Sequence, residues 1–191
     1  MRTLNIIVLV FTLFVATYFD ARYRKIPNKL TVLAIMVGIT FGAIFNRFDG
    51  VLFALGGLFT GLAVFIIPFS MGGMGAGDVK LMAAVGSLMG WKLTVYSALS
   101  TAIIGGIIVL GYTIYKGYFL SLLRNIGVLI YKNILFFTYL STHSEKIMAK
   151  YKKIISVNST LEKAYIPYGV AITTGTLIVL IGNYLGYPPF S

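Results

Sequence analysis

Two aspartates lie at the borders of strongly apolar stretches, where an ionisable side chain needs a specific reason. Asp20 follows the apolar run 4–19, and Asp78 lies in the glycine-rich break GGMGAGD, just before the apolar run 81–89. A charge within a membrane span costs about 2.5–3.5 kcal/mol on insertion scales, so both carboxyls are candidate functional groups. Each also has a structural explanation. The first can pair with nearby arginines, and the second is the kind of acidic residue that the first turn of a helix favours.

Taken together, the two carboxyls predict acid–base chemistry on water. One ionised carboxylate can remove a proton from water while its protonated neighbour donates a hydrogen bond to a scissile carbonyl. Two like charges held close do not ionise together easily, so such a pair titrates as a unit. Gly75 and Gly77 allow close backbone approach just before the second aspartate. Pro27 stiffens the segment that follows the first.

These side chains must be positioned by membrane helices. The chain has 191 residues, 58% of them hydrophobic, and a mean hydropathy of +0.90. In a bilayer with a hydrocarbon core about 30 Å thick, unbroken apolar runs satisfy their backbone hydrogen bonds as helices. We therefore predict one all-α membrane domain over residues 1–191, a polytopic bundle of about six transmembrane helices. The predicted spans are residues 4–19, 30–45, 51–69, 81–89, 93–115 and 166–185.

Three G-x-x-x-G pairs predict close helix packing within this bundle. Small residues at this spacing let two helix backbones approach each other closely. The pairs are Gly38 with Gly42, Gly57 with Gly61, and Gly182 with Gly186.

The basic residues are distributed unevenly over the predicted loops. Thirteen follow the first, third and fifth spans, and only Arg2, Arg47 and Lys92 lie on the other side. Because cytoplasmic loops carry an excess of Lys and Arg, both chain ends are expected on the outer side of the cytoplasmic membrane. The same topology puts Asp20 and Asp78 at the cytoplasmic ends of their spans. The formal charge of +11 is then expected to meet anionic lipid headgroups rather than nucleic acid.

Residues 116–163 are expected to form a basic cytoplasmic or interfacial insertion before the last helix. The stretch 118–141 is apolar but contains Arg124 and Lys132, which are eight residues apart and so share roughly one side of a helix. An amphipathic segment lying in the cytoplasmic interface is therefore favoured. A seventh span is the alternative, and it would place the basic run 146–153 outside, against the charge bias.

Several classes of site have no residues to support them. The chain has no cysteine, which excludes disulfides, a thiol nucleophile and cysteine-ligated zinc. Its one histidine has no companion ligands, and neither a phosphate-binding loop nor a Ser/His/Asp set is present in the sequence. We therefore expect neither a metal nor a cofactor.

Two stretches around the aspartates carry a family likeness. DARYRKIPN (20–28), followed by GAGDVKL (75–81), resembles the type IV prepilin peptidases, which are GxGD-class aspartic proteases of the inner membrane. The order of three features along the chain is also similar: an aspartate after the first span, GxGD after the third, and a proline at the start of the last helix. It implies that Asp20 and Asp78 are the catalytic pair.

Further residues take roles only through this resemblance. Four residues are implied to shape the loops beside the aspartates: Gly75, Gly77, Pro27 and Asn28. Four others are candidates for substrate contact: Lys80, Pro167, Tyr168 and Gly169. The last three belong to IPYG (166–169), which is similar to the family's substrate-facing motif at the start of the last helix. That motif usually has a second proline where Val170 stands.

The resemblance implies an intramembrane aspartic endopeptidase that removes the short basic leader of prepilin-like or preflagellin-like precursors at the cytoplasmic membrane face. Larger family members add a cytoplasmic domain with paired cysteines and an N-methyltransferase activity. With no cysteines and no room before its first span, this chain is expected to be a short form without methyltransferase activity. It is similar to Flp-type prepilin peptidases or archaeal preflagellin peptidases.

Two other functions fit parts of the same pattern. In a small proton-coupled transporter, two membrane aspartates relay protons and a glycine-rich break lines the substrate path. Carriers of that kind tend to repeat the broken segment in both halves, and the sequence has no second copy of the GAGD break. An inactive assembly scaffold would keep the fold without needing both aspartates.

Overall fold

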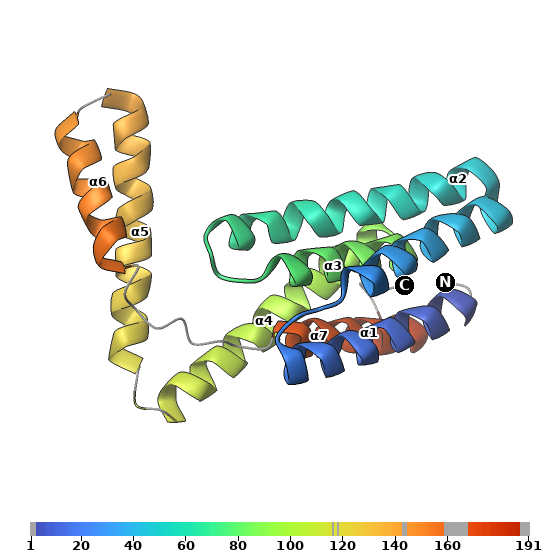
Figure 1. The fold of residues 1–191 in the computed structure, drawn as a ribbon. Coiled ribbons are helices and arrows are strands. Elements are labelled where there is room, and N and C mark those ends of the chain that lie inside the picture. The colour runs from blue at the N-terminus through green and yellow to red at the C-terminus, as the bar shows by residue number, and fades with distance from the viewer. Residues whose placement is uncertain (1–2, 116, 118, 143–144, 159–167, 188–191) are drawn as a thin grey trace. The chain divides into compact units, whose positions relative to one another are not determined.

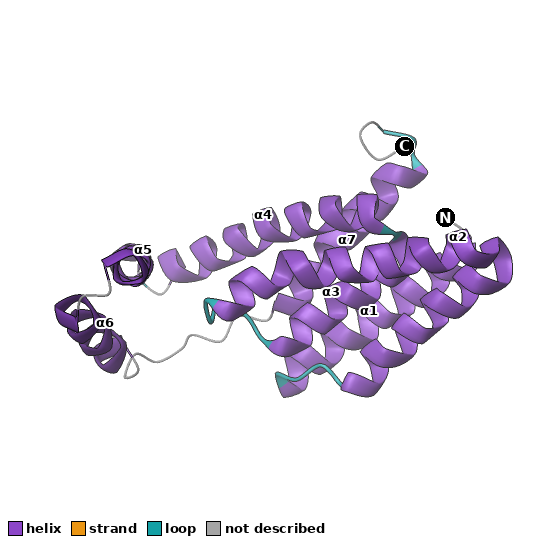
Figure 2. Ribbon diagram, turned by 90° about the horizontal axis from the view of Figure 1, so that it is seen from above, coloured by secondary structure: helices purple, strands orange, loops and turns teal. Residues whose placement is uncertain are grey.

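The computed structural model describes residues 3–115, 117, 119–142, 145–158 and 168–187. The secondary structure of these residues is helical, with turns and loops between the helices (Figure 1, Figure 2). The helices are α1 Thr3–Tyr23, α2 Asn28–Ser70, α3 Ala76–Met89, α4 Trp91–Tyr115, α5 Phe119–Thr142, α6 Glu145–Asn158 and α7 Tyr168–Tyr184. The predicted all-α class is confirmed.

The chain divides into two compact units. One consists of Met1–Ile108 together with Pro167–Ser191, and the other is Val109–Ile166. Both aspartates lie in the first unit. The predicted insertion 116–163 falls within the second unit, where α5 and α6 follow one another.

Three of the described helices are long and apolar enough to cross a membrane: α1, α2 and α4. At a rise of about 1.5 Å per residue, the 21 residues of α1 match the roughly 30 Å hydrocarbon core. The 17-residue α7 is apolar but shorter, and α3 has only 14 residues. The predicted helical membrane fold is therefore confirmed, whereas the number of six spans stays a prediction.

The 43 residues of α2 would be about twice as long as a bilayer core is thick if they formed one straight helix. The helix breaks at Asn46 and Arg47, whose backbone angles are not helical. Arg47 has a φ of 50°, in the left-handed region that non-glycine residues seldom adopt. The two arms, residues 28–45 and 48–70, therefore fold back on each other at the predicted turn NRFDG (Figure 1).

Helix α3 is the centre of its unit. It contacts α1, α2 and α7, and every residue from Asp78 to Met89 except Lys80 is buried. Its apolar side chains pack with Leu9 and Leu13 of α1 and with Ile172 and Val179 of α7 in one core cluster. Figure 1 and Figure 2 show α3 between the arms of α2 and the pair α1 and α7.

Glycines bring α2 and α3 into backbone contact. A Cβ on Gly57 would overlap the carbonyl oxygen of Gly86, and a Cβ on Gly61 would overlap that of Met82. A Cβ on Gly38 would lie 2.8 Å from the carbonyl oxygen of Ser87. The close packing predicted for the glycines of α2 is confirmed, since residues this small are what let the helices approach.

In the last glycine pair, the prediction was wrong for Gly186. This residue lies beyond the end of α7 with a φ of 70°, and a Cβ there would meet no atom of the described residues within 4 Å. This glycine serves the turn after the helix, where positive φ favours a residue without a side chain.

Gly57→Ala should lower the thermal stability of the purified protein in detergent. The added methyl group overlaps backbone that cannot rotate away, and overpacking of this kind typically costs about 1–3 kcal/mol. Gly56→Ala is the matched control, because a Cβ there meets nothing within 4 Å and alanine favours a helix. Equal midpoints for the two variants in a thermal unfolding assay would contradict the packing described for α2 and α3.

Candidate active site

Asp20 lies in the last turn of α1 with only 3% of its surface exposed. Its Oδ2 atom accepts a hydrogen bond from the backbone N–H of Gly169, 2.8 Å away in the first turn of α7. A Cβ on Gly169 would lie 2.7 Å from the same oxygen. A side chain at this position would therefore displace the carboxyl group or the helix.

The segment after Asp20 is bent sharply. Arg24 has a φ of 55°, and its N–H bonds the carbonyl oxygen of Asp20 at 2.9 Å, which closes the end of α1. Pro27 then stands in an extended conformation at the N-terminus of α2. Because proline supplies a fixed φ and needs no hydrogen-bond acceptor, it suits the start of a helix. Only four residues thus separate α1 from α2.

Asp78 lies in the first turn of α3 and is 7% exposed. Its Oδ2 atom accepts the backbone N–H of Gly75, 3.0 Å away at the N-cap position. This is the reach-back half of a capping box, which ties the carboxyl group to the loop before it. The loop GAGD is therefore held by the side chain of its own aspartate.

The pKa of Asp78 is raised to about 6: burial is the largest cause, the hydrogen bond from Gly75 lowers the pKa, and the negative charge of Asp20 raises it. Asp78 precedes the apolar run of α3, a helix too short to cross the hydrocarbon core. Because the charge of Asp20 contributes to this pKa, the two carboxyls lie within electrostatic reach of each other. Tyr168, the first residue of α7, also interacts electrostatically with Asp78.

The loops beside the aspartates contact each other. A Cβ on Gly77 would lie 3.3 Å from the Cβ of the buried Ile26, so glycine keeps this contact short. Lys80 Nζ donates a hydrogen bond to Asn28 Oδ1 at 2.9 Å, which joins the start of α3 to the start of α2. The segment that follows Asp20 therefore lies against the segment that holds Asp78.

Most of the residues singled out in the sequence thus lie at one end of the first unit. Hydrogen bonds connect Asp20 with Gly169, Asp78 with Gly75, and Lys80 with Asn28. Pro167 lies outside the described residues.

The sequence reasoning missed three residues of this region: Ile26, Thr17 and Thr173. Thr17 and Thr173 lie one helical turn from Asp20 and Gly169, respectively, and their hydroxyl oxygens are 2.6 Å apart. Helical spacing from the aspartate and from the IPYG motif was the signal that could have identified the two threonines.

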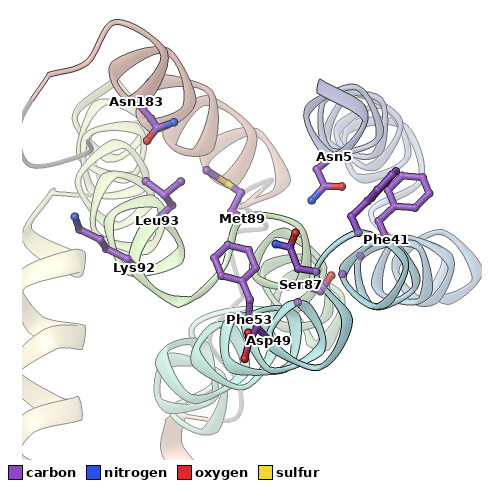
Figure 3. A pocket seen from close by; sticks show the side chains of 14 residues that line it. Asn5, Phe41, Asp49, Phe53, Ser87, Met89, Lys92, Leu93 and Asn183 are labelled. Carbon is purple, nitrogen blue, oxygen red and sulfur yellow. The ribbon is translucent and has the colours of Figure 1, made fainter. Parts of the chain in front are cut away.

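A cavity of about 680 Å³ lies at the other end of the helices (Figure 3). Its lining includes Asn5, fifteen residues before Asp20 on α1, and Met89, eleven residues after Asp78 on α3. These separations correspond to roughly 22 and 16 Å along the helix axes. The two aspartates therefore do not belong to this cavity.

Chemically, the aspartate end of the unit has the groups needed for general acid–base work. Two buried carboxyls come from different helices: the N–H of Gly169 on α7 orients Asp20, and the N–H of Gly75 at the N-cap of α3 orients Asp78. A raised pKa keeps a proton on one of them in mildly acidic solution. One ionised and one protonated carboxyl at the same site can activate a water molecule and polarise a carbonyl group.

Comparison with known proteins gives a family match over a range that contains both aspartates, and matches to curated relatives. The model of the type IV leader peptidase family matches residues 7–110. The prepilin leader peptidase/N-methyltransferase of Aeromonas hydrophila is 30% identical over 129 residues, which are 64% of this chain and 42% of that protein. The protein of the same name from Aeromonas salmonicida (strain A449) matches over the same lengths with the same identity. The chain thus spans less than half the length of these relatives, and no solved structure matches it significantly.

Asp78→Asn should raise thermal stability in detergent above pH 6. The pKa of Asp78 rises on folding from 3.8 to about 6, so the stability gained from holding its proton is complete below pH 3.8 and is lost as the pH rises through 6. The loss is roughly 3 kcal/mol at most. An asparagine carries no charge, and its oxygen can still accept the Gly75 N–H.

The gain in the unfolding midpoint should be several degrees at pH 8 and should shrink toward pH 4. Asp49→Asn is the matched control, because Asp49 is exposed. A stability difference that does not change with pH would contradict this assignment.

Proposed function

This chain belongs to the type IV leader peptidase family, and from that premise we propose that it is an intramembrane aspartic endopeptidase. The observation that carries the proposal is the pair of buried carboxyls, Asp20 on α1 and Asp78 on α3, within electrostatic reach of each other. Family membership favours this function over the proton-coupled transporter considered from the sequence.

The proposed mechanism uses the two carboxyls in different protonation states. Asp78 is the acid, because its pKa of about 6 lets it hold a proton where an ordinary carboxyl has lost it. Asp20 is the base: it takes a proton from water as the water oxygen attacks the scissile carbonyl carbon, while Asp78 protonates the carbonyl oxygen.

The second half of the reaction returns both groups to their starting states. The carbonyl forms again as the C–N bond breaks, the proton on Asp20 passes to the leaving amine, and Asp78 recovers its proton from the collapsing intermediate. The products are a leader with a new carboxyl terminus and a mature chain with a free amine. Activity should fall on the alkaline side as Asp78 loses its proton.

The proposed substrates are prepilin-like or preflagellin-like precursors with a short basic leader before an apolar helix. The names of the Aeromonas relatives and the family support this substrate class. We restrict the proposal to cleavage, since the sequence lacks the cysteines that the resemblance links with the methyltransferase-bearing forms. Gly75, Gly77, Pro27 and Asn28 are proposed to shape the loops, and Lys80, Pro167, Tyr168 and Gly169 to contact the substrate.

The site is proposed to face the cytoplasm from the cell membrane, where basic loops meet anionic lipids. The uneven distribution of Lys and Arg supports this side. A precursor whose apolar helix lies in the bilayer would then present its leader junction at the depth of the two aspartates.

Asp20→Asn and Asp78→Asn should each lower leader cleavage by at least about 100-fold, because an amide neither accepts the proton of water nor cycles it. The double variant should be hardly worse than either single one, since the two residues act as a unit. The measurement is leader removal from a purified prepilin-like precursor in liposomes, followed by mass spectrometry.

Asp49→Asn, in the turn region of α2, is the control for this experiment and should cleave like the wild type. Thermal unfolding of each variant separates loss of chemistry from loss of folding. Full activity in either of the first two variants would remove that aspartate from the mechanism, and full activity in both would exclude an aspartic protease.

The topology has its own test, which is simple because the chain contains no cysteine. In intact cells, Asp49→Cys should react with an impermeant thiol reagent from outside, whereas Ser144→Cys should react only after lysis. Labelling of Ser144→Cys from outside would mean that residues 118–141 cross the membrane and that the last helix runs the other way.

A further inference from the structure

We propose that Thr17 and Thr173 are positioning residues for the reaction: their hydroxyl pair fixes the register of α1 against α7 so that Gly169 can orient the Asp20 carboxyl. This inference rests on the proposed function. The two threonines together form a hydroxyl pair.

The hydroxyl pair joins two helices that are far apart in the sequence. Thr17 Oγ1 lies 2.6 Å from Thr173 Oγ1, and the residues are 156 positions apart. Thr17 Oγ1 also lies 3.4 Å from the carbonyl oxygen of Gly169 on α7, and Thr173 Oγ1 lies 3.3 Å from that of Leu13 on α1. Each hydroxyl therefore reaches a backbone acceptor on the opposite helix as well as its partner.

Counting protons gives two arrangements of this network. A hydroxyl group has one proton to donate. If Thr173 donates to Leu13, Thr17 donates to Thr173; if Thr17 donates to Gly169, Thr173 donates to Thr17. In both arrangements one bond joins the two side chains and one bond reaches a carbonyl across the interface, so neither hydroxyl is left without an acceptor.

The hydroxyl pair lies one helical turn away from the contact of Asp20 with Gly169. Thr17 precedes Asp20 by three residues and Thr173 follows Gly169 by four, spacings that put both members of each pair on one face of their helix. The interface thus has two consecutive polar layers, one made of hydroxyls and one made of a carboxyl and a backbone N–H. Two layers fix both the translation and the rotation of α7 against α1, which one hydrogen bond alone does not.

The contact beside Asp20 needs such precision. The backbone nitrogen of Gly169 is 2.8 Å from Oδ2 of Asp20, and a Cβ on Gly169 would lie 2.7 Å from the same oxygen. The two helices therefore have little room to shift. A displacement of about 1 Å at a reacting group can cost 100-fold in rate. When one hydroxyl is lost, the other keeps only its backbone acceptor on the opposite helix, and the bond between the two side chains is gone.

The test replaces each hydroxyl with a methyl group of nearly the same size. Thr17→Val and Thr173→Val should each lower kcat at least tenfold while KM stays within twofold, because the substrate still binds but the carboxyl is held less accurately. The double variant should lose no more than the worse single one, since either substitution already breaks the pair. Thr17→Ser and Thr173→Ser keep the hydroxyls and should restore kcat to within twofold of the wild type.

Thr176→Val is the matched control on the same helix. Thr176 is buried, as Thr173 is, but its Oγ1 has no hydrogen-bond partner among the described residues. Its loss should leave kcat unchanged and should not lower the unfolding midpoint. If a single valine variant fails to fold, the double valine variant, which removes both hydroxyls, and the two serine variants still decide the question.

The outcomes separate this inference from the proposed function. The positioning role would be overturned by a wild-type kcat in the valine variants, by a loss of kcat that the serine variants do not restore, or by an equal loss in Thr176→Val. In each of these cases, inactive Asp20→Asn and Asp78→Asn variants would leave the protease proposal standing. Active asparagine variants would overturn the proposed function itself.

Discussion

A carboxyl group removed from water needs a hydrogen-bond donor in its place, and this need organises the described site. Asp20 and Asp78 are both buried, and each accepts a backbone N–H from a glycine at the start of a helix. Helix N-termini have free N–H groups and partial positive charge, so they suit negative side chains. Because the donors belong to α7 and to the α3 loop, neither carboxyl is held by its own helix body alone. The site forms only where α1, α3 and α7 meet.

The same constraint explains why the centre of the bundle is a short helix whose backbone touches glycines of α2. Asp78 can reach the end of the unit near Asp20 only if α3 runs through the core, and all its residues after Lys80 are buried. Backbone contacts at Gly57 and Gly61 then bring the second arm of α2 against α3 without a layer of side chains between them. Close approach through glycines is therefore part of how the aspartate is positioned.

The sequence predicted those parts of the structure that depend on local pattern. Apolar runs predicted the long helices, NRFDG predicted the break in α2, and the two unusual aspartates indicated a candidate site, because each signal lies within a few neighbouring residues. The contact of Asp20 with Gly169 joins residues 149 positions apart, and that of Thr17 with Thr173 joins residues still further apart. Such contacts depend on the register of one helix against another, which no local pattern specifies. A raised pKa for one carboxyl of the pair was predicted from the repulsion of like charges, but burial, the largest cause for Asp78, depends on the packing of the bundle and was not.

The burial that makes Asp78 useful also makes it costly. An ionised carboxyl in an apolar bundle destabilises the folded state at neutral pH, and a sequence selected for stability alone would place an amide there. The capping hydrogen bond from Gly75 offsets only part of the cost, because the pKa still rises to about 6. Every buried residue of α3 after Lys80 is apolar or small. Asp78 departs from this pattern, because it is a buried ionisable group that a backbone N–H orients and that lies within electrostatic reach of a second carboxyl. Departures of this kind are expected where function opposes stability, so the energetic cost of Asp78 itself favours a chemical role over a purely structural one.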